Sequence, residues 1–244
     1  MQGKHFLITA LVGLAAFVGG FLLANNLNRS ETNRLRSEIE TSKNTAPATS
    51  GSQTGVLLSD EEIDAKIAEA DSNPENLQFQ KGLGVALYRY GAMRQDVAVI
   101  DKALRILERA HQLDPKDPEL LTTLGNAHFD IGYFGKDNDA FARARGFYEA
   151  ALTSRPDNVE LITDLALTYY LQQPPDLEKA ASQFERSLAK DPKHEKTLQF
   201  YIQTLVKLNK KEKASEELAR LREANPKNPS IAELTELVND AQVR

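Results

Sequence analysis

The chain has 244 residues, of which 41% are apolar and 27% charged, and its formal net charge is −5. It contains no cysteine, which excludes disulfides, thiolate metal sites and cysteine nucleophiles. From residue 59 onward there are 25 basic and 32 acidic side chains, a balance of 25 − 32 = −7. This acidity argues against nucleic acid as a partner, because phosphate binding needs clustered positive charge.

The first predicted element is an apolar block from Phe6 to Ala24, in which 15 of 19 residues are apolar and none is charged. A helix of this length spans about 28 Å, close to the roughly 30 Å core of a bilayer. We therefore predict one transmembrane helix within an N-terminal anchor at residues 1–27. A cleaved secretory signal is the alternative, although no A-x-A-like site follows the block. The expected location is the inner (cytoplasmic) membrane, single-pass. The Lys and Arg counts favour a cytoplasmic C-terminus, but a short charged N-terminal tail commonly stays inside, and on that ground we expect an extracytoplasmic domain.

A polar segment follows at residues 28–58, and its stretch from Thr41 to Gly55 has no aromatic residue and one charge. Such a composition cannot bury enough apolar surface to offset chain entropy, so we predict a flexible tether. Ser59 and Glu62 then form the pattern of a capping box, which predicts a helix to about Ala70. We interpret residues 59–73 as an N-terminal capping helix.

The remaining chain is repetitive. Five prolines close similar phrases and are separated by 41, 41, 36 and 34 residues: Pro74, Pro115, Pro156, Pro192 and Pro226. Proline cannot continue a helix, so each phrase predicts a turn between units. A near-constant period of this size is typical of stacked two-helix units.

Small and large residues recur at fixed offsets within each unit. An alanine lies 12 residues before each of the last four prolines, and a large apolar residue follows it by four: Ala103 and Leu107, Ala144 and Tyr148, Ala180 and Phe184, Ala214 and Leu218. The preceding helix carries Leu83-Gly84, Leu124-Gly125, Leu165-Ala166 and Tyr201-Ile202. Spacing of i and i+4 puts a small and a large residue on one helix face, so we expect two helices in close approach.

These residues resemble the pattern of the tetratricopeptide repeat (TPR) family. The resemblance implies an all-α fold: a right-handed α-solenoid of four TPR-like helix pairs at residues 74–227, with N- and C-terminal capping helices, the latter at 228–244. The first two units place 19 residues between Gly84 and Ala103, and between Gly125 and Ala144, where the family has 12. Each therefore carries a seven-residue extension between its helices. We expect the second extension to form a hairpin that exposes Tyr133 and Phe134.

No catalytic constellation or metal site stands out in the sequence. His128 and Asp130 precede Asp137 and Asp139, but this spacing lacks the Gly and Glu of a calcium loop. Gly82-Leu83-Gly84 lacks a third glycine and a preceding strand, so it is not a dinucleotide fingerprint. We predict no catalytic residue, no metal, no cofactor and no small-molecule substrate, and we do not expect an enzyme.

The resemblance also implies a binding groove, because in this family the first helix of each unit lines the concave side. Carried onto this chain, the candidate groove residues are Lys81, Tyr88, Arg89, Asn126, Phe129, Asp130, Thr163, Tyr170, Gln203 and Lys207. Aromatic rings along a polar groove suit an extended peptide or a partner helix. Packing of these residues inside the domain is the alternative, and Tyr133 and Phe134 offer a second candidate surface.

Together, the features predict a membrane-tethered bacterial scaffold that binds a partner polypeptide in the groove, for complex assembly or quality control. The architecture is similar to that of TPR subunits of cytochrome c maturation systems, although no C-x-x-C-H motif is present. The alternative hypothesis is a structural adaptor in a membrane complex that binds through its convex face or the extensions.

Overall fold

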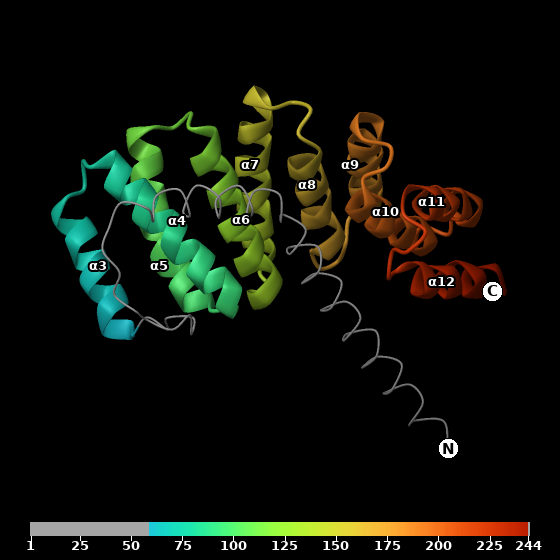
Figure 1. The fold of residues 1–244 in the computed structure, drawn as a ribbon, viewed down its shortest axis with the longest axis horizontal. Helices are drawn as coiled ribbons and strands as arrows, with labels where there is room; N and C mark the ends of the chain where they lie inside the picture. The colour runs from blue at the N-terminus through green and yellow to red at the C-terminus, as the bar shows by residue number, and fades with distance from the viewer. Residues whose placement is uncertain (1–58, 244) are drawn as a thin grey trace, which may run out of the picture. The chain divides into compact units, whose positions relative to one another are not determined.

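The computed structural model describes residues 59–243, and these form helices and turns only. Ten helices follow one another in this part of the chain (Figure 1). Their bounds are α3 Asp60–Ser72, α4 Leu77–Arg94, α5 Val97–Leu113, α6 Pro118–Gly135, α7 Asn138–Ser154, α8 Val159–Leu171, α9 Leu177–Lys190, α10 Glu195–Lys207, α11 Lys211–Ala224 and α12 Ile231–Val243. The predicted all-α solenoid is confirmed for the described residues.

The predicted membrane location is not supported. The anchor at 1–27 and the tether at 28–58 lie outside the described residues. Across residues 59–243, no helix has the length and apolar character that a bilayer crossing requires. Spanning takes about 20 consecutive apolar residues, whereas every helix of this part mixes buried apolar and exposed charged positions. The single-pass inner-membrane assignment is therefore corrected.

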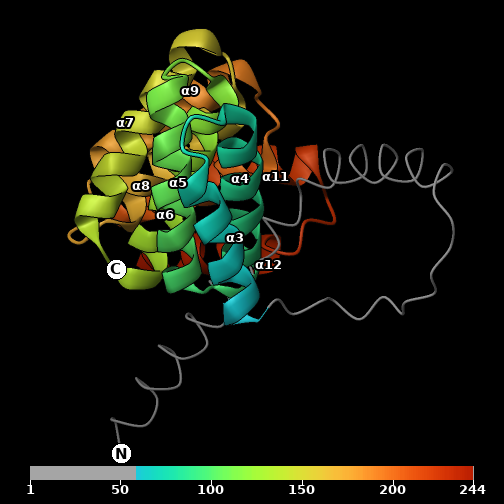
Figure 2. The ribbon, with the colours of Figure 1, turned by 90° about the vertical axis from the view of Figure 1, so that its left-hand side faces the viewer.

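The helices are arranged as consecutive antiparallel pairs. Packing is densest within α4/α5, α6/α7, α8/α9 and α10/α11. Helix α3 packs on α4 and α5, and α12 packs on α10 and α11. Viewed from the α3 end, the later helices follow behind the first pair (Figure 2). Successive first helices α4, α6, α8 and α10 also contact one another, whereas contacts between successive second helices are weaker. The first helices therefore form one continuous face.

The prolines mark the turns between pairs, as the sequence predicts. Each of the five lies in a short turn that separates two helices. Three of these turns end in an Asn or Asp that caps the next helix. Asn76 accepts a hydrogen bond from the Phe79 backbone N–H, and Asp117 and Asn158 accept in the same way. Proline stops one helix and the cap starts the next, so the repeat period is fixed locally.

Glycine sets the distance between the two helices of a pair. A Cβ atom added at Gly84 would lie 2.8 Å from the side chain of Leu107, and one added at Gly125 would lie 2.6 Å from the ring of Tyr148. Real Cβ contacts are not that short, so the Leu107 side chain or the Tyr148 ring must move if the facing glycine is replaced. The predicted small-to-large contacts are confirmed at these two positions.

The extensions are helical, and the predicted hairpin is wrong. Helices α4 and α6 have 18 residues each, whereas α8 has 13. The two-residue turns after them consist of Gln95-Asp96 and Lys136-Asp137, in which Gln95 and Lys136 adopt φ of 56° and 55°. The aspartate of each turn caps the second helix. Each extension therefore adds about one turn to both helices of its pair instead of a loop.

A second glycine makes room for the added turns. Gly132 follows Gly125 by seven residues, and a Cβ atom there would lie 2.8 Å from the ring of Phe141. Gly91 occupies the same place in the first pair, where a Cβ atom would lie 2.9 Å from the Ile100 side chain. The extensions therefore repeat the contacts of Gly84 and Gly125 about two turns further along the same helices.

Candidate functional site

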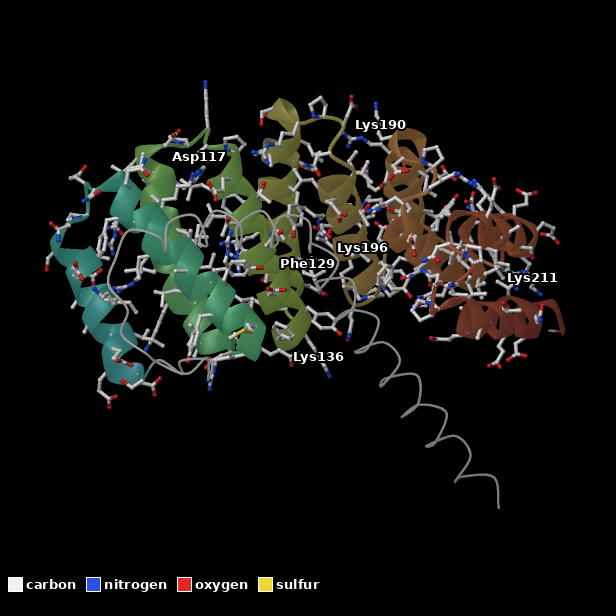
Figure 3. The ribbon with its side chains drawn as sticks, in the orientation of Figure 1. Asp117, Phe129, Lys136, Lys190, Lys196 and Lys211 are labelled. Carbon is white, nitrogen blue, oxygen red and sulfur yellow. The ribbon has the colours of Figure 1, made fainter. Side chains whose placement is uncertain are left out.

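All ten candidate groove residues lie on first helices. We call the surface along which these helices meet the first-helix face, and it carries Lys81, Tyr88 and Arg89 on α4, Asn126, Phe129 and Asp130 on α6, Thr163 and Tyr170 on α8, and Gln203 and Lys207 on α10. Phe129 and Lys196 mark the middle of the row of helices in Figure 3. The structure shows which of these side chains interact and how exposed each one is.

The first two pairs are joined by polar contacts on this face. The ammonium group of Lys81 lies 2.7 Å from a carboxylate oxygen of Asp117 and 2.6 Å from one of Glu119. Burial of the ammonium opposes its charge, but these two carboxylates raise the pKa of Lys81 overall. Further along, the Tyr88 hydroxyl donates to Asp130 at 2.9 Å. Both contacts fix the position of α4 against α6.

Asp130 is the most perturbed acid on the face. Only 3% of its surface is exposed. Burial raises the pKa of Asp130 to about 7; the hydrogen bond from Tyr88 lowers it, and the charge of Asp164 on α8 raises it further. Burial and the neighbouring Asp130 also raise the pKa of Tyr88. The carboxyl of Asp130 on α6 therefore titrates near neutral pH, under the influence of Tyr88 on α4 and Asp164 on α8.

Two of the three candidate aromatics are buried. Phe129 and Tyr170 expose 5% of their surface each. Phe129 packs edge-on against Phe141 with ring centroids 5.7 Å apart. The Tyr170 hydroxyl donates to Gln203 at 2.9 Å, which joins α8 to α10. The rings of Phe129 and Tyr170 therefore contribute mainly to packing between helices. Tyr88, the third candidate aromatic, is half-buried.

A buried chain of hydroxyls joins the third and fourth pairs. The Thr163 hydroxyl lies 2.7 Å from that of Thr197, and both are fully buried. His194 Nδ1 lies 2.6 Å from the Thr197 hydroxyl, and its Nε2 lies 2.9 Å from a carboxylate oxygen of Glu160. The hydrogen bond with His194 lowers the pKa of Glu160. Hydroxyl, imidazole and carboxylate follow one another here as they do in a hydrolase triad. The Thr197 hydroxyl is fully buried and cannot reach a substrate, so we assign these hydrogen bonds a structural role.

Sequence reasoning missed the partner of Lys196. Its ammonium group lies 2.7 Å from a carboxylate oxygen of Asp164. Burial lowers the pKa of Lys196, but the charges of Asp164 and Glu160 outweigh burial and raise that pKa overall. Lys196 and Asp164 are 32 residues apart, and only the stacking of α10 on α8 brings them together. Asp164 is the sixth residue of α8 and Lys196 is the second residue of α10, so the repeat period alone does not pair them.

Arg89 and Lys207 are the exposed cations of the candidate set. Within residues 59–243, neither has a carboxylate at ion-pair distance. The Lys207 ammonium lies 4.2 Å from the centroid of the Tyr170 ring. Asn126 is tied down, because its side-chain oxygen accepts a hydrogen bond from the Tyr148 hydroxyl at 2.9 Å. A ligand on this face would therefore meet Arg89 and Lys207 first.

Tyr133 and Phe134 lie on the last turn of α6, not in a loop. Their rings pack edge-on with centroids 5.3 Å apart, and both residues are half-buried. Phe134 packs against the apolar cluster that includes Ile100 and Leu104. The second candidate surface is therefore partly occupied by the domain itself.

The aspartate cluster after His128 does not form a metal site. In the described part of the chain, no group of three or more His, Cys, Asp or Glu side chains could hold a metal ion. His128 is buried and stacks on Phe147 with ring centroids 5.5 Å apart. Among the residues that the structure describes, neither of its ring nitrogens has a hydrogen-bond partner. Burial and the charge of Arg143 lower the pKa of His128 to about 4, so the ring is neutral at physiological pH.

Comparisons with known proteins agree with this fold. A family model for the tetratricopeptide repeat matches residues 175–237, which is well under half of the chain. The comparison with curated protein sequences gave no match.

Solved structures match over most of the chain at low identity. A crystal structure of MamA is 17% identical with a TM-score of 0.55, over 70% of this chain and 98% of that one. A TPR protein from Parabacteroides merdae is 19% identical with a TM-score of 0.54, over 64% and 59% of the two chains. YrrB, described as a TPR protein with an unusual peptide-binding site, is 16% identical with a TM-score of 0.50, over 74% and 93%.

At these identities the likeness concerns the fold. None of the proteins named above is a cytochrome c maturation subunit, so that finer resemblance gains no support. The matched segment 175–237 contains the complete fourth helix pair, α10 and α11. The described residues therefore have the helix-pair fold of tetratricopeptide repeat proteins, and the fourth pair carries the family's sequence pattern.

Proposed function

We propose that the protein is an interaction scaffold that binds a partner polypeptide along the first-helix face. One observation carries the proposal: contacts between neighbouring pairs hold the polar side chains of this face in place, while Arg89 and Lys207 stay exposed near its two ends. A face whose side chains are already fixed loses little conformational entropy when a ligand binds. YrrB, which shares the fold, is described as having a peptide-binding site, and this adds support.

The charges of the face suit an extended ligand. Arg89 lies on the second-to-last turn of α4 and Lys207 is the last residue of α10. Acidic groups lie between them, including Asp164 and Glu160, but these are already paired with Lys196 or His194. The two exposed cations are therefore the positions where a partner gains charge-assisted hydrogen bonds.

Site-specific photo-crosslinking in the full-length chain tests the proposal. A photoreactive residue in place of Ala86, which is exposed on α4 three residues before Arg89, is expected to crosslink to a discrete partner, and one placed at position 143 on α7 is not. Lys207→Glu is expected to reduce the crosslink from position 86 about tenfold, since reversing one contact charge costs about 1.4 kcal/mol or more.

Arg143→Glu is the matched control. Arg143 is an exposed arginine on a second helix, and its nearest carboxylate oxygen, on Asp137, is 3.8 Å away. This variant is expected to leave the crosslink from position 86 unchanged. Crosslinks of equal yield at position 143, or a position-86 crosslink that is indifferent to Lys207→Glu, would contradict binding along the first-helix face.

The adaptor hypothesis remains as a second candidate because of Met93. This residue lies on the last turn of α4, within the first extension, and exposes 76% of its surface. Methionine is over-represented at adaptable binding surfaces, because its side chain is flexible and polarizable. Under this hypothesis Met93→Glu abolishes partner binding and Arg89→Glu has no effect, so the two variants separate the hypotheses.

A further inference from the structure

Lysines that lie over tyrosine rings in this domain usually have a carboxylate as well. Lys179 lies 5.5 Å from the centroid of the Tyr169 ring and 2.9 Å from a carboxylate oxygen of Asp176. Lys213 combines a tyrosine ring with Glu185 in the same way. The carboxylate hydrogen bonds raise the pKa of both lysines. In these two places the charge is compensated within the chain.

Lys207 lacks such a carboxylate. Its ammonium group is the closest of the three to a ring, at 4.2 Å from the Tyr170 centroid. Within residues 59–243, no carboxylate oxygen lies within 4.0 Å of it. Burial lowers the pKa of Lys207 and no neighbouring charge counteracts this. The residue as a whole is nonetheless exposed, at the last position of α10.

A second donor stands beside it. Gln203 precedes Lys207 by four residues on α10, so the two side chains lie on the same face of the helix. The Gln203 side-chain oxygen accepts the hydrogen bond from Tyr170, which turns its NH2 group away from the ring. In the part of the chain that the structure describes, this NH2 group has no acceptor. The ammonium and the amide are therefore neighbouring donors without an anion.

We infer that Lys207 and Gln203 together bind an acidic side chain, Asp or Glu, of the partner polypeptide. A carboxylate has two oxygens, one for each donor, and such charge-assisted hydrogen bonds are stronger than neutral ones. The inference rests on the proposed function, since it names the residue type that the first-helix face recognises at its α10 end.

The two donors match one acidic side chain. Lys207 and Gln203 together supply one donor for each oxygen of a single carboxylate. The expected recognition element is thus one Asp or Glu at a fixed position of the partner polypeptide.

Selection from a random-peptide library displayed on phage tests the inference with the full-length chain. The displayed peptides are fused at their C-termini, so that only side chains can supply the carboxylate. The wild-type chain is expected to enrich peptides with Asp or Glu at one fixed position. A selected peptide is expected to bind about tenfold more weakly to Lys207→Met, and equally weakly when its acidic residue is changed to the amide.

Lys179→Met is the matched control, because it removes a lysine over a tyrosine ring whose charge is already paired. It is expected to leave the selected sequences and affinities unchanged. Circular dichroism is expected to show that both Met variants are as helical as the wild-type chain. Gln203→Ala is expected to weaken binding as well, and the amide form of the peptide is expected to be much less sensitive to Lys207→Met than the acidic form is.

The outcomes separate this inference from the proposed function. Peptides that lack a fixed acidic residue but lose binding in Arg89→Glu would refute the inference and leave the proposed function intact. An acidic consensus retained in Lys207→Met would also overturn the inference. Failure to enrich any peptide would count against both.

Discussion

Replacing Asp130 by asparagine should stabilise the protein increasingly as pH rises. The carboxyl of Asp130 is 3% exposed, accepts a hydrogen bond from Tyr88 and faces Asp164. Burial raises its pKa to about 7 in the folded state, whereas the ordinary value is 3.8. Asparagine has nearly the same shape and still accepts from Tyr88, but it cannot ionise.

The sign and size of the effect follow from proton linkage. Below the unfolded pKa of 3.8, both states hold the proton and the carboxyl has no cost. As pH rises towards 7, the unfolded chain releases its proton first, so the folded state becomes relatively less stable, and above 7 the full cost remains. A difference of about 3 pH units sets an upper limit of about 4 kcal/mol. Relaxation around the charge reduces this, and we expect about 2 kcal/mol between pH 4 and pH 8.

Urea unfolding followed by circular dichroism at several pH values between 4 and 8 measures the effect. Asp130→Asn and wild type should have similar free energies of unfolding at pH 4 and should diverge at pH 8, with the variant more stable. Tyr88→Phe removes the hydrogen bond that lowers the pKa of Asp130, so it should steepen the loss of stability with pH. Asp101→Asn, at an exposed position of α5, is the control. A difference between Asp130→Asn and wild type that is constant from pH 4 to pH 8 would refute the argument.

Two further predictions concern helix packing and capping. Gly125→Ala should lower the free energy of unfolding by about 1 to 3 kcal/mol, because the new methyl group meets Tyr148. Gly146→Ala, where a Cβ atom meets nothing within 4 Å, should raise the free energy of unfolding by up to about 1 kcal/mol. Denaturant titration of both variants measures the difference. Ser59→Ala removes one half of the capping box with Glu62 and should cost helix α3 about 1 kcal/mol. Hydrogen exchange should then show faster exchange of α3 amides with α10 unchanged, and unaltered α3 protection would contradict the role of the cap.

The helix pairs could be predicted because their signals are local and repeated. Proline disrupts the interior of a helix, and a capping residue starts a helix, so the turns follow from local residue types. The contact of Gly125 with Tyr148 follows from the same logic, since a small and a large residue recur at fixed offsets. The capping box of Ser59 with Glu62 is likewise a short-range pattern.

The extensions were misjudged because their turn chemistry was overlooked. A residue with positive φ followed by a capping aspartate needs only two positions to reverse the chain, as at Lys136-Asp137. The remaining extension residues are then free to lengthen both helices. Gly132, seven residues after Gly125, was the available signal, because it continues the same packing contact.

The sequence by itself determined the repeat, the helix pairs and the residues that could occupy the first-helix face. Only the tertiary structure decided what those residues do. Tyr88 and Asp130 are 42 residues apart, and Lys196 and Asp164 are 32 apart, so their contacts depend on the angle at which one pair stacks on the next. The same stacking buries Phe129 and, within residues 59–243, leaves Lys207 without a carboxylate at ion-pair distance. Local patterns specify where helices begin and end, whereas burial and charge compensation depend on neighbours that are distant in the chain.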